Sequence, residues 1–277
     1  MKLKYYGTAA AEGIPGLFCG CELCRYAREH GGRDIRTRSQ AAVDGRLLID
    51  FPPDTLMHTI CGGLDLNEVH SCIITHSHSD HLYAADLEMR RKGFAHPSGD
   101  RPFTFYSSPK ASESIRDIIN KYDLEKQNRV LLKVIEPYRP YTIEGYTVVA
   151  LEANHDPNSG PYFYIISDGK SSMIYGNDTG YFPQKAWEYL EREKIVFGFV
   201  SLDCTGMDMK GMVNWHMSLD TAAKVKERLI STGCADQSTI WCVHHFSHNG
   251  GLTHAKLEEA AGRYGFIVSY DGLEVEF

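Results

Sequence analysis

Short apolar runs recur along the chain, and several are followed at once by polar residues of the kinds that bind metals. Runs of four to seven such residues are typical of buried β-strands. The pattern predicts strand ends that meet around one shared site. The runs and the polar segments after them are Ser71–Ile74 before Thr75–His81, Val148–Leu151 before Asn154–Asp156, Ser172–Tyr175 before Gly176–Gly180, Val196–Leu202 before Asp203–Cys204, and Thr239–Val243 before His244–His248.

Helical patterns fill the intervals between these strands. Apolar residues at Ile115, Ile118 and Ile119 share one helical face, which predicts a helix within Pro109–Asp123. Proline and hydroxyl residues suited to helix starts indicate further helices, and an Asp-Gly pair indicates a hairpin. The remaining predicted elements are helices at Pro183–Glu193, Ser218–Ile230 and Leu252–Gly262, a strand at Lys2–Tyr6 and a hairpin at Asp271-Gly272.

The segment Thr75–His81 carries the most specific chemical signal. It holds four potential metal ligands, His76, His78, Asp80 and His81, within six positions. Alternation along an extended segment sends His76 and His78 to the same side, and the next two ligands can reach a second cation as the chain turns. The pattern favours divalent cations over a polar loop that only happens to contain histidines.

A second candidate metal site begins near the N-terminus with Cys19, Cys21 and Cys24 in the spacing C-x-C-x-x-C. Without a secretory signal, this spacing favours a metal over a disulfide framework, and a redox-active or merely exposed cysteine cluster is the alternative. Three thiolates leave a tetrahedral zinc ion one ligand short. The fourth ligand must therefore come from a distant part of the sequence.

Composition and charge exclude several classes of protein. The chain is 43% hydrophobic and 23% charged, as in ordinary globular proteins. Its net charge is −7, and the sequence contains no block of basic residues. A broad nucleic-acid interface is therefore not expected. We expect a cytoplasmic protein without a membrane segment, because no apolar run approaches the length of a membrane span and the first residues contain no apolar signal core.

The order of Thr75–His81, His155, Asp178 and a late histidine resembles the metallo-β-lactamase superfold over essentially the whole chain. With the cysteine loop and His245–His248, the chain is similar to the PhnP-type phosphodiesterases of the carbon–phosphorus lyase pathway. The resemblance implies an α/β (α+β) fold class, a four-layer αββα sandwich. It also implies one domain over residues 1–277 with an N-terminal Cys-rich zinc loop at about residues 13–25.

The resemblance also implies a set of ligands. His244 and His245 compete for the late position. Neighbours on a strand face opposite ways, and the family spacing from His248 favours His245. The implied sets are His76, His78 and His155 for one metal ion, Asp80, His81 and His245 for the other, Asp178 as a bridge, and Cys19, Cys21, Cys24 and His248 for a structural zinc ion.

Further residues have expected roles around this site. Asp80 and His216 are the candidate catalytic residues. His216 matches a histidine of the phosphodiesterase family that could donate a proton or stabilise phosphoryl oxygens. The alternative for His216 is a surface histidine beside a helix start. Asp50 and Asp203 end strands and could orient ligating imidazoles. The remaining expectations are phosphate binding or a solvated helix face for Arg90 and Arg91, pocket-framing segments at Arg90–Arg101 and Gly206–Asn214, and surface positions for His30, His58, His70, His96 and His254.

These assignments lead to a metal-dependent phosphodiesterase that cleaves a small phosphodiester, such as a cyclic ribose phosphate, with a hydroxide bridging two Zn or Mn ions. Two divalent cations give +4, and Asp80, Asp178 and hydroxide leave about +1, which attracts a diester monoanion. The alternatives are a thioester hydrolase of the same superfold and an accessory protein of cofactor biosynthesis similar to PqqB. The oligomeric state stays open, with a homodimer as one option.

Overall fold

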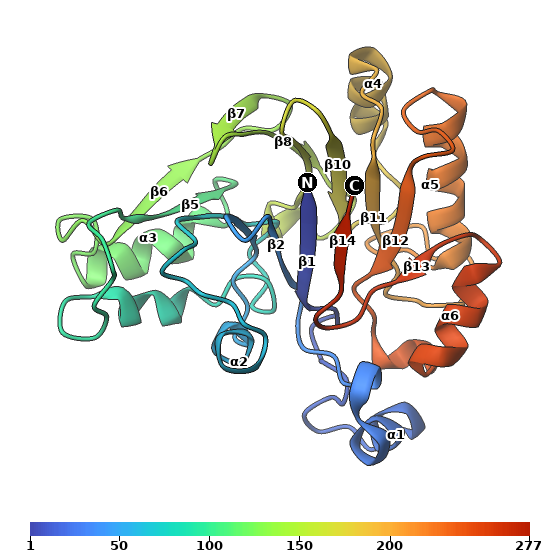
Figure 1. The fold of residues 1–277 in the computed structure, drawn as a ribbon, viewed down its shortest axis with the longest axis horizontal. Helices are drawn as coiled ribbons and strands as arrows, with labels where there is room; N and C mark the ends of the chain where they lie inside the picture. Colours follow the sequence, from blue (N-terminus) through green and yellow to red (C-terminus); the bar gives the residue numbers. More distant parts are fainter.

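The computed structural model describes residues 1–277, and its strands form two seven-stranded sheets (Figure 1). The first sheet takes most of its strands from the first half of the chain, and the final strand joins it beside β1, so that the N- and C-termini lie side by side. In order across this sheet, the strands are β14 (Glu274–Glu276), β1 (Lys2–Gly7), β2 (Gln40–Val43), β3 (Leu47–Ile49), β4 (Ser71–Ile73), β5 (Phe103–Ser107) and β6 (Val130–Val134).

The second sheet is formed by the second half of the chain. Three neighbouring strand pairings on one side of this sheet are parallel, and the three on the other side are antiparallel. In order, the strands are β13 (Ile267–Val268), β12 (Ile240–His244), β11 (Phe199–Asp203), β10 (Ser172–Gly176), β9 (Tyr162–Ser167), β8 (Tyr146–Glu152) and β7 (Pro140–Ile143).

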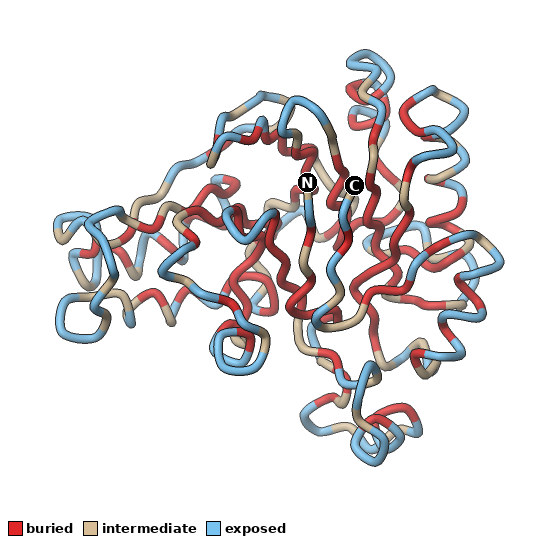
Figure 2. Tube along the Cα trace, viewed as in Figure 1, coloured by how far each residue is buried: buried red, intermediate tan, exposed pale blue.

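Three buried apolar clusters separate four layers of structure. The central cluster joins side chains of both sheets, including Tyr5 and Ile73 from the first and Tyr164 and Phe199 from the second. The other two clusters lie on the outer faces, where the helices cover each sheet. Figure 2 shows this burial along the central strands. The αββα sandwich predicted from the sequence is therefore confirmed.

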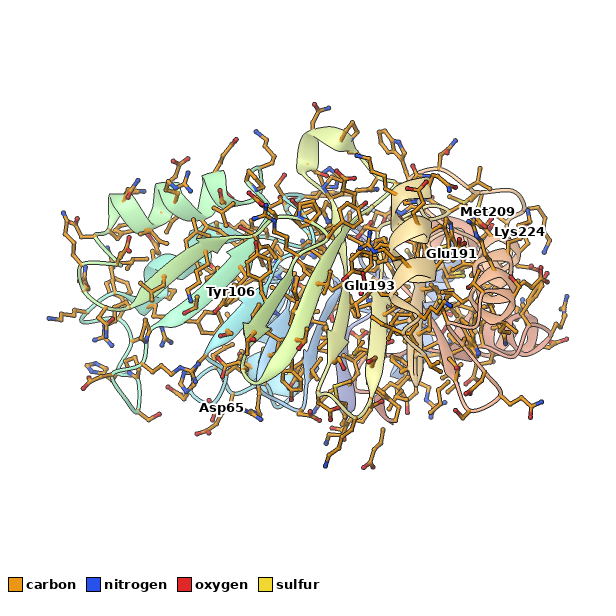
Figure 3. The ribbon with its side chains drawn as sticks, turned by 90° about the horizontal axis from the view of Figure 1, so that it is seen from above. Asp65, Tyr106, Glu191, Glu193, Met209 and Lys224 are labelled. Atoms are coloured by element: carbon orange, nitrogen blue, oxygen red, sulfur yellow. The ribbon has the colours of Figure 1, made fainter.

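The predicted helices are all present, with boundaries shifted by a few residues. Ser218 and Thr253 stand at the N-cap positions of two of them, as expected. Figure 3 shows the helical layer beside the second sheet, marked by Glu191 and Lys224, and Tyr106 of β5 in the other half. The α-helices are α1 (Glu22–His30), α2 (Thr55–Cys61), α3 (Ser112–Lys121), α4 (Gln184–Glu193), α5 (Leu219–Ser231) and α6 (His254–Gly262); the 3₁₀ helices are η1 (Gly32–Asp34), η2 (Ala84–Arg90), η3 (Pro157–Ser159) and η4 (His248–Gly250). None of these helices is long and apolar enough to cross a membrane.

The hairpin predicted at Asp271-Gly272 is wrong. The chain does reverse there, and Gly272 has a φ of 97°, but the strands on either side belong to different sheets. β13 pairs with β12, while β14 pairs with β1. The Asp271 carboxylate accepts hydrogen bonds from the Thr8 hydroxyl (2.6 Å) and the Thr37 amide (2.7 Å). The turn therefore carries the chain from one sheet to the other.

Two histidines expected at the surface are buried instead. His58 hydrogen-bonds through one ring nitrogen to Gln40 and through the other to Thr37. His254 Nδ1 accepts from the Arg36 guanidinium at 2.9 Å. Both rings satisfy polar groups between layers, a role that depends on partners distant in sequence.

Candidate metal centre

The metal-type residues singled out in the sequence meet where strands of the two sheets end. His76, His78, Asp80 and His81 follow β4, and the other ligand residues follow β8, β10 and β12. Because β4 and the other three strands belong to opposite sheets, closing the sandwich brings the two halves of the site together. The residues that follow the strands of the second sheet are His155, Asp178 and His245.

Three histidines form the first group. The ring nitrogen His76 Nε2 lies 2.9 Å from His78 Nδ1, which lies 3.2 Å from His155 Nε2. Ligands of a tetrahedral zinc ion, with bonds near 2.0–2.1 Å, are about 3.4 Å apart. These three nitrogens are therefore spaced to share one metal ion.

The second group combines carboxylates with histidines. His81 Nε2 lies 3.1 Å from Asp80 Oδ2 and 2.6 Å from Asp178 Oδ2, and His245 Nε2 lies 3.0 Å from the same Asp178 oxygen. The other oxygen of Asp178 lies 3.9 Å from His155 Nε2 in the first group. Asp178 thus faces both groups, as a bridging carboxylate would.

Outer hydrogen bonds fix which ring nitrogen of His81 and of His155 faces the centre. Nδ1 of His81 lies 2.7 Å from Asp50, and Nδ1 of His155 lies 3.1 Å from the Trp215 carbonyl. A backbone carbonyl and an ionised carboxylate can only accept hydrogen bonds. In each neutral ring the proton therefore sits on Nδ1. The Nε2 lone pairs then point to the centre, which is the form in which imidazole binds a metal ion.

The charges at the centre fit divalent cations. Asp178 Oδ2 is buried and makes no hydrogen bond, although two ring nitrogens lie close to it. Lone pairs held against a buried carboxylate repel it unless a cation lies between them. Without a cation, a proton must lie between the ring nitrogen and the carboxylate. Burial opposes the charged form of the His81 ring, but Asp178 and Asp80 outweigh burial and raise the pKa of His81 well above its usual value. The residues present therefore fit the metal ions that the sequence pattern predicted.

Four residues at this centre have a left-handed backbone conformation. Asp50, Asp178, Trp215 and His245 all have φ between 47° and 66°, a region that residues with a side chain seldom adopt. Such conformations persist where the surrounding structure holds them, and they often accompany functional sites.

The two late histidines lie in different environments. His245 lies in the second group, whereas His244 is buried between the sheets. Its Nε2 lies 2.8 Å from the Ser39 hydroxyl and 3.1 Å from the Tyr175 hydroxyl. His244 therefore belongs to a polar cluster inside the core.

The cysteine loop meets His248, at the start of η4, in a second candidate site. Sγ of Cys19 and Cys21 lie 3.5 and 3.6 Å from His248 Nδ1, and Cys24 completes the cluster. For zinc bonds of about 2.3 Å to sulfur and 2.05 Å to nitrogen, a tetrahedral angle predicts about 3.6 Å. The spacing therefore fits one zinc ion bound by three cysteines and a histidine.

Thiolate formation also fits zinc binding at this loop. Burial raises the pKa of Cys21, but the Cys24 amide and hydrogen bonds with Cys19, Cys24 and His248 outweigh it and lower the pKa to about 6. The thiolate is the form of cysteine that binds metals. Cys21 is thus the cysteine whose thiolate the loop favours, whereas burial and the hydrogen bonds with Cys21 and Cys19 raise the pKa of Cys24 to about 11.

A pocket of about 320 Å³ opens over the first site, and we call it the metal-centre pocket. It is lined by ligand residues of both groups and by side chains from three loops. His216 is in its wall, with Nδ1 3.1 Å from Asp203 Oδ2 and 3.5 Å from Asp178 Oδ1. The lining residues outside the predicted set are Ala10, Ala11, Glu12, Thr205, Trp215, Ser247 and Asn249.

Arg90 and Arg91 do not reach this pocket, so the phosphate-binding hypothesis for them is wrong. Arg90 Nε donates to a backbone carbonyl at 2.9 Å, and the Arg91 guanidinium lies 3.7 Å from the centre of the Phe94 ring. No residue of Arg90–Arg101 lines the pocket, so the expectation that this segment frames it is also wrong, whereas Thr205 and Trp215, at the two ends of Gly206–Asn214, do line it. Both arginines hold their own loop together by donation and stacking.

Several partners of the ligands were missed in the sequence. Thr205 Oγ1 donates to Asp203 and lies 2.9 Å from His245 Nδ1, so it can accept from that ring. Asp156 Oδ2 lies 3.4 Å from His78 Nε2. Both residues stand within two positions of a predicted site residue, and this proximity was the available signal in the sequence. Short polar residues are so common in loops that proximity alone does not identify a partner of a ligand.

Removing the carboxylate behind His81 tests the role of these outer hydrogen bonds. Asp50 is fully buried, accepts from the Thr75 amide (2.8 Å) and lies against His81. We expect Asp50→Asn to lower the affinity of the second group for metal by about 10- to 100-fold, because the amide no longer fixes the ring. Metal titration checks this, with the exposed Asp65→Asn as control; unchanged affinity would contradict it.

Comparison with known proteins places the chain in a family. Residues 46–244 match the family model of the beta-lactamase superfamily domain. The chain belongs to this superfamily.

Individual relatives point in two directions. Coenzyme PQQ synthesis protein B of Bradyrhizobium diazoefficiens is 28% identical over 162 residues, which are 52% of this chain and 48% of that protein. The zinc-bound PqqB structure from Methylobacterium extorquens has a TM-score of 0.77 at 19% identity, with all of both chains covered. A diphosphatase of the PhnP family has a TM-score of 0.75 at 22% identity, covering 100% of this chain and 97% of its own. The matched region spans about half the length of the PqqB relatives, and the two structures show a shared fold.

Proposed function

We propose that this protein is a metal-dependent phosphodiesterase that hydrolyses a small phosphodiester, such as a cyclic ribose phosphate. The observation that carries the proposal is the Asp178 carboxylate, which faces a three-histidine group on one side and the Asp80–His81–His245 group on the other. Two divalent ions, Zn or Mn, bound there would supply Lewis-acid polarisation and a more acidic water. A third ion, zinc, would be held by the cysteine loop and His248.

The chain's own residues position the substrate and manage its protons. Two divalent cations would bring +4, and Asp80, Asp178 and a hydroxide would reduce this to about +1, which suits a diester monoanion. His216 stands in the pocket wall and can donate a proton to the departing oxygen. Asp203 accepts from the Met217 amide at 2.7 Å and lies beside His216 Nδ1, so it holds that ring in place.

The test combines metal content with substrate choice. Purified protein is expected to bind about three metal ions per chain and to hydrolyse bis(p-nitrophenyl) phosphate but not a thioester. Elemental analysis and a chromogenic assay measure both. Thioester turnover without diester turnover would assign the thioester hydrolase alternative.

A second candidate function is that of an accessory protein in cofactor biosynthesis similar to PqqB. It is favoured by the PqqB proteins among the relatives. The shared metal-type clusters do not separate the two functions. Full metal loading without hydrolysis of any diester or thioester would favour this second candidate.

His216 predicts a specific dependence on pH. Burial lowers its pKa, but Asp203 and Asp178 outweigh burial and raise it above the usual value. A proton donor is active while protonated, so turnover should fall as the pH rises through that pKa; bound cations would move the fall back toward neutrality. We expect His216→Gln to reduce kcat by about 100-fold or more and to flatten this alkaline limb. A pH–rate profile that keeps the limb in the variant would rule out the donor role.

A further inference from the structure

The metal-centre pocket contains one large apolar side chain, the indole of Trp215. This residue is 52% exposed, whereas the two other tryptophans, Trp187 and Trp241, are 1% and 6% exposed. The other apolar residues of the lining are Ala10 and Ala11. Exposing a large aromatic ring at the mouth of a site leaves apolar area that a ligand can cover.

The loop before Trp215 is held firmly, so the ring is presented at a fixed place. The Val213 carbonyl accepts from the Tyr181 amide (2.9 Å) and from Asn154 Nδ2 (3.1 Å). Gly180 packs so closely that an added Cβ would lie 2.2 Å from the Val213 carbonyl oxygen. Trp215 itself has a φ of 66°, and its carbonyl lies 3.1 Å from His155 Nδ1. The backbone at Trp215 thus orients His155, and the indole packs edge-to-face against the His155 ring, with centroids 5.8 Å apart, while the rest of its surface is open to the pocket.

The rest of the lining limits what a substrate can carry. No lysine or arginine lines the pocket, and its histidines, His216 included, lie at the metal centre, so a phosphate away from that centre meets no cationic side chain. Glu12, in the wall, accepts from Ser247 Oγ (2.9 Å) and Asn249 Nδ2 (3.1 Å) through Oε1. Its carboxylate would repel a second anionic group. The part of the substrate next to the phosphodiester is therefore neutral, and Trp215 is the one side chain that can bind a large apolar face.

We propose that Trp215 is a stacking platform that determines specificity, and that the substrate is a phosphodiester bearing a planar aromatic ring, such as a nucleobase, on the group that enters the pocket. The inference rests on the proposed function, because it takes the phosphoryl group to lie at the metal centre. Stacking on an indole selects planar rings of any base and is lost when the ring is truncated.

A pair of product-like ligands isolates the stacking contact. Adenosine 5′-monophosphate and ribose 5-phosphate share the sugar and the phosphate, and only the first has a base. Trp215→Ala should weaken binding of adenosine 5′-monophosphate by on the order of tenfold to 100-fold and leave ribose 5-phosphate within about twofold. Trp215→Phe should keep most of the affinity, because it keeps a ring. Isothermal titration of the metal-loaded protein measures all three proteins.

Fluorescence gives a readout that does not require turnover. Since Trp187 and Trp241 are buried, acrylamide should quench mainly Trp215, and adenosine 5′-monophosphate should protect it while ribose 5-phosphate does not. Met209→Ala is the matched control, because Met209 is exposed on the same loop but does not line the pocket; it should change neither binding nor quenching.

The outcomes separate the two proposals. If adenosine 5′-monophosphate binds no more tightly than ribose 5-phosphate, or if Trp215→Ala weakens both equally, the platform is refuted whatever the enzyme hydrolyses. If the base-dependent binding depends on Trp215 but no diester is cleaved, the platform stands and the phosphodiesterase proposal fails.

Discussion

Replacing Asp178 with asparagine is expected to lower phosphodiester turnover by on the order of 1,000-fold, the largest effect of any conservative change in this chain. The amide has nearly the same shape, but it carries no negative charge and offers one oxygen where two are needed. One carboxylate oxygen lies against His81 and His245, and the other faces His155. Metal content should fall at the histidine groups while the cysteine-bound ion remains, which elemental analysis of the variant measures.

The matched control is Asp168→Asn. Asp168 accepts from the amides of Lys170 and Ser171 in the turn between β9 and β10, and an asparagine oxygen can accept from the same donors. Turnover and metal content of this variant should equal those of the unmodified protein. If Asp178→Asn keeps full metal occupancy and turnover within about tenfold, a bridging role for this carboxylate is excluded.

Loss of one zinc ligand in the cysteine loop is expected to produce the largest change in stability. Cys21→Ser should lower the free energy of unfolding by roughly 3–5 kcal/mol, because zinc bound by a distant histidine and a local loop joins parts of the chain far apart in sequence. At about 2–4 °C per kcal/mol for a chain of this size, the Tm should fall by roughly 10 °C. Differential scanning calorimetry and zinc analysis measure the two effects together.

Cys61→Ser is the control for this experiment, because Cys61 is exposed and lies outside both metal-type clusters. It should leave the Tm unchanged. The pH profile of turnover in Cys21→Ser should keep its shape, since the cysteine loop takes no part in the chemistry. A variant that retains a full complement of zinc and its Tm would show that Cys21 is not a ligand.

The fold and the first half of the site could be predicted from the sequence because the relevant signals are local. Apolar runs mark the strands, and His76, His78, Asp80 and His81 are adjacent in the chain, so one short segment carries both strand end and chemistry. The Asp271-Gly272 prediction shows the limit of local signals. Turn residues specify that the chain reverses, but they do not specify which strand the next segment joins.

Residues whose roles depend on distant partners were the ones that the sequence described poorly. His58 and His254 looked like surface residues, yet each is hydrogen-bonded to a side chain distant in the sequence. Thr205 and Asp156 lie beside predicted site residues, but their hydrogen bonds exist only because loops from different strands converge. Polar side chains have many local alternatives, so their pairing is decided by packing.

The sequence by itself determined the superfamily, the order of the metal-type residues and the cysteine spacing, because these depend on residue type and local position. Only the tertiary structure decided that His245 faces the centre while His244 lies in the core, that His248 completes the cysteine cluster, and that Trp215 stands exposed in the pocket. The physical reason is the closure of one sheet onto the other. It sets which strand ends meet and which side of each strand faces the gap, and neither is encoded within a single segment.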